Sequence, residues 1–335
     1  MRILIVGGTG FLGKATAEAA VAAGHHVTVM TRSGRNVAKG AQSLIADRTA
    51  PLPDLSGQFD AVIDTCAYAP DMVRQLAQAV GCVHYCLVSS ISVYDQMTVP
   101  QFDESAHAPP ATDADLALAD AVPAALRGKA DPYGAAYGRL KRSCELAAED
   151  AFAGRCTHIR LGLIVGPQDY TDRFTWWVRR LDRDGLAYVP GPEDRNMQII
   201  DVRDAAAFLL KATAAQNCDT FHLTGQPMGF ATMLAGILGQ TGKDVAITYL
   251  PLAAFTAAGQ RHWTDLPLIL PDDPAFAQML NVSTAKAQKA GLVTRALAET
   301  VLSVLGWDRA RRDHPLICGM PAEAEAQVAA ANAAR

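Results

Sequence analysis

Tyr137 and Lys141 place a phenol and an ammonium four residues apart, in the stretch Tyr137-Gly-Arg-Leu-Lys141. Residues four apart on an α-helix lie on one face, so the charge of the lysine can act on the phenol. A free tyrosine has a pKa near 10, and a nearby cation lowers this pKa because it stabilises the phenolate. A decrease of roughly three units would let Tyr137 donate and accept protons near neutral pH. The spacing therefore predicts an acid–base catalyst, although so short a pattern also arises by chance.

A hydroxyl-rich segment ends another apolar run, Cys86-Leu87-Val88-Ser89-Ser90-Ile91-Ser92-Val93-Tyr94. A serine at the end of a strand can hydrogen-bond the oxygen of a carbonyl and stabilise the negative charge that develops on it. Serines at strand ends also form ordinary turns, which is the alternative interpretation.

A glycine-rich turn, Gly-Gly-Thr-Gly-Phe-Leu-Gly, lies between a predicted strand at Ile3–Val6 and a predicted helix. Its first glycines allow a tight turn that approaches a pyrophosphate, and Gly13 allows the helix to pack closely on the strand. The helix N-terminus supplies N–H groups and partial positive charge for phosphates. The turn predicts a dinucleotide site, and the alternative is a glycine cluster that only closes a loop. The residues expected to line the site are Gly7, Gly10, Phe11, Leu12 and Gly13.

The end of the second predicted strand carries Arg32 and Arg35 but no acidic residue. NAD sites usually hold the ribose 2′-hydroxyl with Asp or Glu at this point, whereas an arginine suits the 2′-phosphate of NADP. We therefore expect NADP(H), with NAD(H) as the alternative if the two arginines are only solvated surface residues. Asp47, just after the third strand, is either an acceptor for the adenine amino group or an exposed turn residue.

These segments need a scaffold that brings the carboxyl ends of several strands together. Short β-branched runs alternate with helix-like stretches in the first half of the chain, which is typical of βαβ units and a parallel sheet. The segment 95–132 shows no clear periodicity and is predicted to be a functional loop or lid. The main predicted strands are Ile3–Val6, Val27–Thr31, Ser43–Ala46, Ala61–Asp64, Tyr85–Ser89 and His158–Val165, and the main helices are Phe11–Ala23, Met72–Val80 and Tyr133–Phe152.

The pattern predicts an α/β fold, a Rossmann-type doubly wound parallel sheet with a smaller C-terminal substrate domain. We expect residues 1–165, with about 196–225, to form the dinucleotide-binding domain. Residues 166–195 and 226–320 would form the substrate domain, and 321–335 a terminal helix or frayed tail.

Composition narrows the possible functions. The chain has 335 residues and a net charge of −4, which gives no reason to expect nucleic acid or an anionic membrane as a partner. No apolar run reaches the roughly 20 residues that span a bilayer. Seven cysteines without a Cys-x-x-Cys pair predict reduced core thiols in a cytoplasmic protein. Neither these cysteines nor the eight scattered histidines have metal-ligand spacing, so no metal site is expected.

Taken together, these segments resemble the extended short-chain dehydrogenase/reductases, the NAD-dependent epimerase/dehydratase family. The resemblance covers nearly the whole chain. It implies that Ser90 polarises a substrate oxygen, that Tyr137 is the acid–base, and that Lys141 lowers its pKa and holds the nicotinamide ribose. The chemistry it implies is hydride transfer between nicotinamide and a carbon that bears a hydroxyl or carbonyl group. The motifs that carry it are Gly7–Gly13, Ser89–Tyr94, Tyr137–Lys141, Gly166-Pro167 and Ile200-Asp201-Val202-Arg203-Asp204.

The segment after Gly166-Pro167 resembles some bacterial family members, and Arg173, Trp176 and Trp177 are predicted to shape the substrate pocket. The alternative is an amphipathic helix that packs its aromatic side chains into the core.

Departures from the family pattern narrow the reaction. Dehydratases of the family follow the catalytic hydroxyl with Asp-Glu, whereas this chain has Ile91-Ser92. An arginine and an asparagine common in nucleotide-sugar epimerases are also missing near Ile200 and after Arg160. The leading prediction is an NADP(H)-dependent oxidoreductase acting on a small polar or aromatic molecule. The alternatives are a sugar or nucleotide-sugar epimerase that retains NAD, and a family member with a degraded site recruited to RNA binding or regulation.

The helix predicted at Tyr133–Phe152 also bears on assembly. Family members often dimerise through this helix, so a homodimer is predicted, but the same stripe of small and apolar residues also serves a core face. The stripe consists of Ala136, Leu140, Cys144, Ala147 and Ala151.

Overall fold

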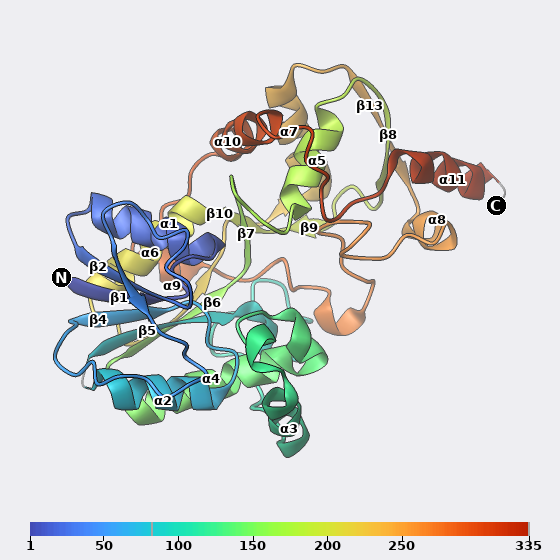
Figure 1. Ribbon diagram of the computed structural model, residues 1–335. Coiled ribbons are helices and arrows are strands. Elements are labelled where there is room, and N and C mark those ends of the chain that lie inside the picture. Colours follow the sequence, from blue (N-terminus) through green and yellow to red (C-terminus); the bar gives the residue numbers. More distant parts are fainter. Residues whose placement is uncertain (82, 334–335) are drawn as a thin grey trace. The chain divides into compact units, whose positions relative to one another are not determined.

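A computed structural model describes residues 1–81 and 83–333 (Figure 1). The chain folds into two compact units. Unit 1 comprises Met1–Ile164, Val202–Thr224 and Val282–Val293, and unit 2 comprises Val165–Asp201, Gly225–Asn281 and Thr294–Arg335. Cys82 lies outside the described residues, and the other six cysteines are free thiols.

Unit 1 is built on a seven-stranded sheet in which all the pairings are parallel. Its central strands β4 and β5 are buried along their whole length, because helices cover both faces of the sheet. The strand order reverses direction between β1 and β4, and ligands of open α/β sheets bind at such a point, outside the carboxyl ends of the strands. The predicted doubly wound α/β fold is confirmed. Across the sheet the strands are β11 (Thr220–Leu223), β6 (Cys156–Leu161), β5 (His84–Ser90), β4 (Ala61–Asp64), β1 (Arg2–Val6), β2 (His26–Thr31) and β3 (Gln42–Ile45).

Two pairs of helices cover the sheet of unit 1 (Figure 1). On one face α1 (Phe11–Ala22) packs against α6 (Val202–Ala214), and on the other α2 (Pro70–Val80) packs against α4 (Tyr137–Phe152). The register pairs Val6 with Asp64 and Ser90 with Leu161, so the segments that follow these strands leave the same edge of the sheet.

The helix predicted from Tyr133 begins later than expected. Gly134 has a φ of 47°, which interrupts the helical backbone and leaves a short 3₁₀ segment, η3 (Asp131–Ala136), before α4. Tyr137 is therefore the first residue of α4. Four of the five stripe residues of this helix are buried in the chain's own fold and only Ala151 is exposed, so the stripe is a core face.

The segment 95–132 contains a helix that its composition did not predict, α3 (Asp113–Ala121). Thr112 and Asp115 form a capping box at its start, in which each side chain accepts a hydrogen bond from the backbone N–H of the other residue. Arg139 of α4 binds the Asp115 carboxylate through two hydrogen bonds of 2.7 and 2.9 Å. The other elements of unit 1 are η1 (Ile91–Val93), η2 (Ala124–Leu126) and α9 (Ala285–Lys289).

Unit 2 is mainly helical, and α5 (Arg173–Leu181), α7 (Phe230–Thr241) and α10 (Leu297–Arg309) pack on one another. A parallel pair joins β8 (Gly185–Pro190) to β13 (Val245–Leu250), and an antiparallel pair joins β9 (Asn196–Met197) to β12 (Met228–Gly229). The last helix, α11 (Ala322–Ala333), packs against α8 (Leu252–Ala257) and buries Ala324 and Val328. The remaining elements of unit 2 are β10 (Ile199–Asp201) and η4 (Pro274–Phe276), and β7 (Leu163–Val165) spans the point where the chain passes from unit 1 to unit 2.

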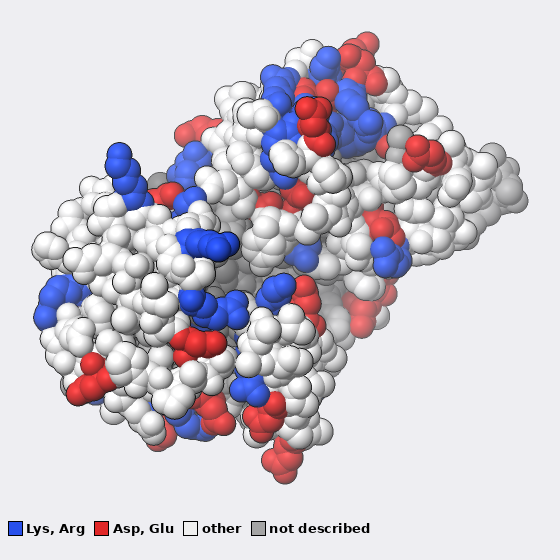
Figure 2. Space-filling model, viewed as in Figure 1, with Lys and Arg blue, Asp and Glu red and all other residues white. Residues whose placement is uncertain are grey.

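Charged side chains of both signs are interspersed on the face shown in Figure 2. Unit 2 also contains ion pairs with a buried carboxylate, such as Arg179 of α5 with Asp308 of α10 at 2.6 Å. None of the helices within residues 1–81 and 83–333 is both long enough and apolar enough to cross a bilayer.

Candidate active site

Ser90 and Tyr137 meet at the carboxyl edge of the sheet. Ser90 is the last residue of β5, and its Oγ accepts a hydrogen bond of 3.1 Å from the backbone N–H of Ser92, which caps η1. The same hydroxyl hydrogen-bonds the phenol of Tyr137 at the start of α4. Two groups 47 positions apart in the sequence are thus in direct contact, with Ser90 held by its own backbone turn.

Gly138 explains how α4 comes so close to the serine segment. A Cβ atom at this position would overlap the backbone carbonyl oxygen of Ser92. Only a residue without a side chain lets the first turn of α4 lie directly on the η1 backbone. Sequence analysis did not identify this role, because the contact is with a backbone atom distant in the chain.

Lys141 lies one turn further along α4 and is only 2% exposed. Its Nζ donates to the carbonyl oxygens of Ala67, after β4, at 2.7 Å and of Val88, in β5, at 2.5 Å. Two of its three N–H bonds are therefore used by the described residues, which leaves one for a bound molecule.

The Tyr137 pKa shifts in the direction opposite to the one expected. Burial raises the pKa of the phenol above its usual value, and the hydrogen bond from Ser90 only partly opposes this effect. Burial also lowers the pKa of Lys141, because removal from water penalises its charged form. Burial is thus the larger effect on the pKa of the phenol in this structure, and a lowering of this pKa by Lys141 stays a prediction.

The glycine turn has the shape that a dinucleotide requires. Gly7 has a φ of 81°, a conformation that L side chains rarely adopt, and a Cβ on Gly13 would overlap the carbonyl oxygen of Gly7. Gly10 is the N-cap of α1 and provides no side-chain cap, so the first N–H groups of the helix face outward beside Phe11 and Leu12. These features fit a pyrophosphate bound at the N-terminus of α1.

Arg32 and Arg35 are exposed and follow β2. Arg32 makes one long hydrogen bond, 3.5 Å, to the carbonyl oxygen of Ala125, and the side chain of Arg35 has no partner among residues 1–81 and 83–333. The Asp47 carboxylate accepts hydrogen bonds from the N–H and hydroxyl of Thr49, which lower its pKa, and the charge of Arg32 adds to this effect. Asn36, which sequence analysis missed, donates to the carbonyl oxygen of Thr9 in the glycine turn at 2.9 Å.

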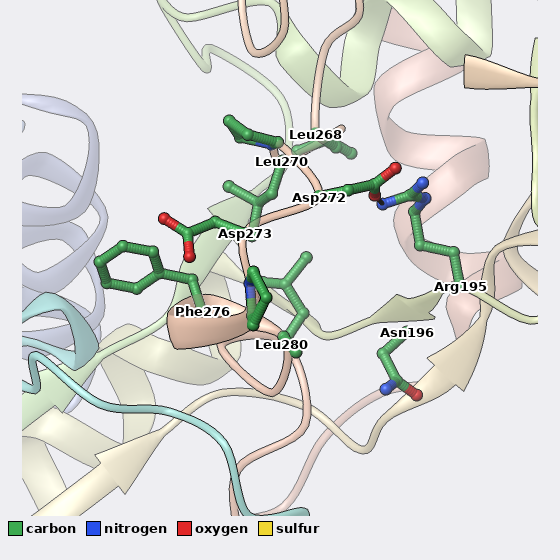
Figure 3. Close-up of a pocket in the computed structure, with 11 residues that line it drawn as sticks. Arg195, Asn196, Leu268, Leu270, Asp272, Asp273, Phe276 and Leu280 are labelled. Atoms are coloured by element: carbon green, nitrogen blue, oxygen red, sulfur yellow. Dashed lines mark hydrogen bonds and ion pairs between the residues drawn. The ribbon is translucent and has the colours of Figure 1, made fainter. Parts of the chain in front are cut away.

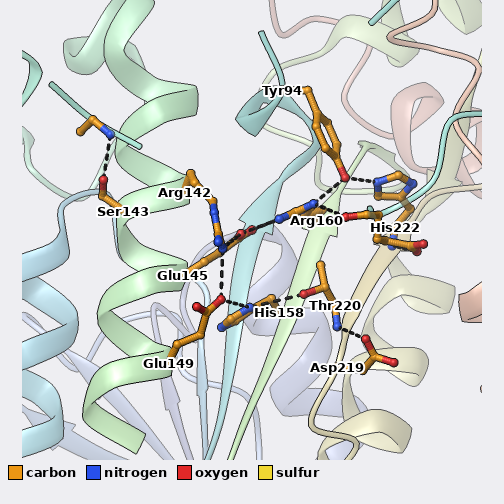
Figure 4. A network of polar contacts seen from close by, with 12 residues as sticks. Tyr94, Arg142, Ser143, Glu145, Glu149, His158, Arg160, Asp219, Thr220 and His222 are labelled. Atoms are coloured by element: carbon orange, nitrogen blue, oxygen red, sulfur yellow. Dashed lines mark hydrogen bonds and ion pairs between the residues drawn. The ribbon is translucent and has the colours of Figure 1, made fainter. Parts of the chain in front are cut away.

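A buried polar network joins α4 to the sheet (Figure 4). Arg160 of β6 binds both carboxylate oxygens of Glu145, at 3.0 and 2.8 Å, and donates to the Tyr94 hydroxyl at 2.5 Å. These contacts hold the Glu145 pKa at about 2, while burial raises the Tyr94 pKa to about 12. The network therefore fixes the helix that carries Tyr137 and Lys141 to the segment that follows Ser90.

The network continues from Tyr94 to His222 of β11, 2.6 Å away. The carbonyl oxygen of Ser283 lies 3.0 Å from His222 Nδ1 and can only accept, so Nδ1 carries the proton. His222 Nε2 then accepts from the Tyr94 hydroxyl, and burial lowers the pKa of this histidine, consistent with a neutral ring.

The aromatic residues predicted for a substrate pocket lie in the interior of unit 2. Trp176 and Trp177 pack edge to face, with their ring centroids 4.6 Å apart, and Trp177 is 1% exposed. The indole of Trp177 donates to the carbonyl oxygen of Pro267 at 2.8 Å. Arg173 lies over the ring of Trp263, 4.4 Å from its centroid. None of the three predicted residues lines the pocket described next.

Unit 2 contains a partly open pocket of about 430 Å³ (Figure 3). Its single arginine, Arg195, is bound to the carboxylate of Asp272 at 3.0 Å and to the carbonyl oxygen of Gly191 at 3.1 Å. The rest of its wall is mostly apolar and includes Leu268, Leu270, Pro271, Pro274, Phe276, Ala277 and Leu280. In the part of the chain that the structure describes, no group of three or more His, Cys, Asp or Glu residues could hold a metal ion.

Comparison with known proteins places this chain in a family. Residues 3–222 match the model of the NAD dependent epimerase/dehydratase family. No curated protein matches the chain significantly.

Solved structures share the fold. A putative epimerase from Burkholderia cenocepacia J2315 is 21% identical with a TM-score of 0.64, over 92% of this chain and 98% of that one. A UDP-N-acetylglucosamine 4-epimerase from Bacillus cereus is 17% identical with a TM-score of 0.62, over 92% and 99%. A UDP-glucuronic acid 4-epimerase from Bacillus cereus, solved with NAD, is 13% identical with a TM-score of 0.64, over 95% and 100%. At these identities the likeness shows the fold alone, whereas the family model matches most of the sequence: the chain belongs to the NAD dependent epimerase/dehydratase family.

Proposed function

We propose that this protein is an enzyme that moves a hydride between nicotinamide and a hydroxyl- or carbonyl-bearing carbon of a small molecule. The observation that carries the proposal is the hydrogen bond between Ser90 and Tyr137, one helical turn from the buried Lys141. This arrangement lies in the same unit as the glycine turn.

Each residue has a distinct part in this proposal. Ser90 and Tyr137 hydrogen-bond the substrate oxygen, and Tyr137 gives a proton to that oxygen or takes one from it. Lys141 directs its remaining N–H to the nicotinamide ribose, and its charge stabilises the phenolate when Tyr137 has lost its proton. Bound nicotinamide supplies or accepts the hydride. Gly7, Gly10 and Gly13 hold the pyrophosphate, and Asp47 accepts from the adenine amino group.

Two versions of this chemistry differ in the fate of the cofactor. Arg32 and Arg35, exposed in a segment from Thr31 to Arg35 that contains no acidic residue, support NADP(H) as a dissociable cofactor and net reduction of a carbonyl. The family model and the likeness to 4-epimerase structures favour the second version, an epimerase that keeps NAD and returns the hydride to the opposite face.

The pocket of unit 2 supports a small substrate without a diphosphate. Its arginine is already neutralised by Asp272, and Asp273 adds a second carboxylate to the wall. A diphosphate would meet no free cation there and would be repelled by both carboxylates. The leucines, prolines and Phe276 suit an apolar ring instead.

The nucleotide content of the protein tests the proposal. The freshly purified chain is denatured, any released nucleotide is identified, and the emptied chain is titrated with NADPH and NADH. Release of about one NAD(H) per chain supports the epimerase. An empty chain that binds NADPH at least tenfold more tightly than NADH, about 1.4 kcal/mol, supports the reductase. A chain that releases neither nucleotide and binds neither contradicts both.

A further inference from the structure

The buried charge of Lys141 needs stabilisation that its hydrogen bonds only partly supply. A buried ammonium is costly unless opposite charge or strong dipoles surround it. The carbonyl oxygens of Ala67 and Val88 provide two dipoles. No carboxylate within residues 1–81 and 83–333 forms an ion pair with Lys141 at 4 Å or less.

Two carboxylates that act electrostatically on Lys141, those of Asp64 and Glu145, are bound to other cations. Asp64 of β4 is held by Arg48 through two hydrogen bonds of 2.6 and 2.8 Å, and it also accepts from Tyr85. Glu145 of α4 is held by Arg160 in the network of Figure 4. The other titratable groups that act on Lys141 are the thiols of Cys66 and Cys144, and burial raises the pKa of both, so they are neutral.

The ring of Tyr68 also faces the ammonium. Lys141 Nζ lies 5.3 Å from the centroid of this ring, within the distance at which the negative face of an aromatic ring attracts a cation. Tyr68 follows Ala67 directly, so one short segment supplies both a carbonyl and a ring to the same charge.

Tyr68 also contacts Tyr137. Its ring stacks on Tyr133, with centroids 5.6 Å apart and planes 16° apart, and lies 6.2 Å from the ring of Tyr137 at 41°. Tyr133 is fully buried, and its hydroxyl donates to the carbonyl oxygen of Arg127. The stack therefore gives Tyr68 a fixed position from which to contact both proposed catalytic side chains.

We infer that Tyr68 is a positioning residue, whose ring holds the ammonium of Lys141 in its charged form and supports one side of the Tyr137 ring. Its importance for turnover rests on the proposed function. The contact itself does not, and it can be measured in the chain without cofactor or substrate.

The test is the pKa of Lys141, followed by NMR of the full chain labelled at the lysine side chains, with the signal assigned from a Lys141→Arg variant. The ring stabilises the charged form, so Tyr68→Leu is expected to lower the Lys141 pKa by about half a pH unit to one unit. Tyr68→Phe keeps the ring and is expected to leave the pKa close to that of the parent chain.

Two controls separate the ring effect from general damage. Pentafluorophenylalanine at position 68 keeps the shape of a phenyl ring but reverses the charge of its face, so the Lys141 pKa should fall relative to Tyr68→Phe. Phe102→Leu removes a ring of unit 1 that packs on Tyr94 and His222 instead, and it should leave the Lys141 pKa unchanged.

An unchanged or higher Lys141 pKa in the fluorinated variant, or equal pKa values in Tyr68→Leu and Tyr68→Phe, overturns the inference. Neither result bears on nicotinamide binding. Failure of the proposed function would instead appear as a chain that binds no nicotinamide dinucleotide while its Lys141 pKa still responds to Tyr68.

Discussion

At the scale of single residues, the proposed site contains groups in two different environments. Tyr137 and Lys141 belong to one, and the two exposed arginines belong to the other. Lys141 is buried and Tyr137 is partly buried, and burial moves the pKa of each towards its neutral form. Arg32 and Arg35 remain exposed to water, so folding has not desolvated their guanidinium groups. Guanidinium groups bind phosphates through charge-assisted hydrogen bonds. In the proposed function, the residues for acid–base chemistry and those for nucleotide selectivity thus lie in contrasting environments.

The arginines give a prediction about selectivity. The double variant Arg32→Ala/Arg35→Ala is expected to raise the Kd for NADPH at least tenfold, because charge-assisted hydrogen bonds to the 2′-phosphate are lost. The Kd for NADH should change less than twofold. Fluorescence titration of the nicotinamide measures both values.

Arg74→Ala is the matched control, since Arg74 is an exposed arginine of α2 that pairs with Asp71. Equal weakening of NADPH and NADH binding in the double variant would show that Arg32 and Arg35 do not read the 2′-phosphate.

At the scale of elements, the site depends on the close packing of α4 on η1 and on the attachment of α4 to β6. Gly138 permits the first contact, and Glu145 with Arg160 provides the second. The two contacts lie on either side of Lys141, so both ends of the catalytic part of the helix are fixed.

Gly138→Ala tests the first contact. The added methyl group would overlap the backbone carbonyl of Ser92, which cannot rotate away as a side chain would, so α4 must shift. We expect a loss of about 1–3 kcal/mol in the free energy of unfolding and at least a tenfold loss of turnover. Denaturant unfolding and steady-state kinetics measure the two effects.

Gly239→Ala provides the comparison, because Gly239 is an exposed glycine inside α7 with open space around its Cβ position. This variant should gain up to about 1 kcal/mol from helix propensity. If Gly138→Ala behaved in the same way, α4 and η1 would not be in close contact in solution.

The Glu145–Arg160 pair predicts a pH dependence of stability. The folded-state pKa of Glu145 is depressed, from 4.5 to about 2, so its contribution is present above pH 4.5 and is lost as pH falls towards 2. The difference corresponds to about 3 kcal/mol as an upper estimate. The Glu145→Gln variant should therefore lose less free energy of unfolding than the parent chain when the pH falls from 4.5 to 2, as measured by urea unfolding. Parallel curves for the two proteins over this range would contradict the assignment.

The sequence predicted the local parts of this site better than the distant ones. Tyr137 and Lys141 lie on one helix, and the glycine turn lies between a strand and a helix, so the placement of both features followed from the local sequence. The contacts of Gly138 with Ser92 and of Tyr94 with His222, 128 residues apart, exist only in the folded chain. Burial of Tyr137, which determines the direction of its pKa shift, likewise depends on neighbours that spacing does not reveal.

At the scale of the whole molecule, the fold is that of the family, while our proposal of a substrate without a diphosphate rests on the pocket of unit 2. Its arginine is engaged by Asp272, and the rest of its wall is largely apolar. If this pocket holds the substrate, as we propose, the balance of its charges contributes to substrate class beyond what the shared fold determines.

The effect of the charges in this pocket on ligand binding can be tested. The parent chain should bind UDP weakly, and Asp272→Asn, which frees Arg195 from its carboxylate, should strengthen UDP binding several-fold, measured by calorimetry. Asp265→Asn, which frees Arg261 outside the pocket, is the control. Tight binding of UDP by the parent chain would contradict our view of this pocket.

The most direct measurement is the rate at which the nicotinamide of the loaded enzyme changes its redox state, followed by absorbance, with a panel of small secondary alcohols and ketones. Tyr137→Phe keeps the ring but removes the proton donor, and it is expected to slow this rate at least a hundredfold while leaving nucleotide binding intact. Equal rates in the parent chain and Tyr137→Phe would contradict the central claim that Tyr137 moves the proton of this reaction.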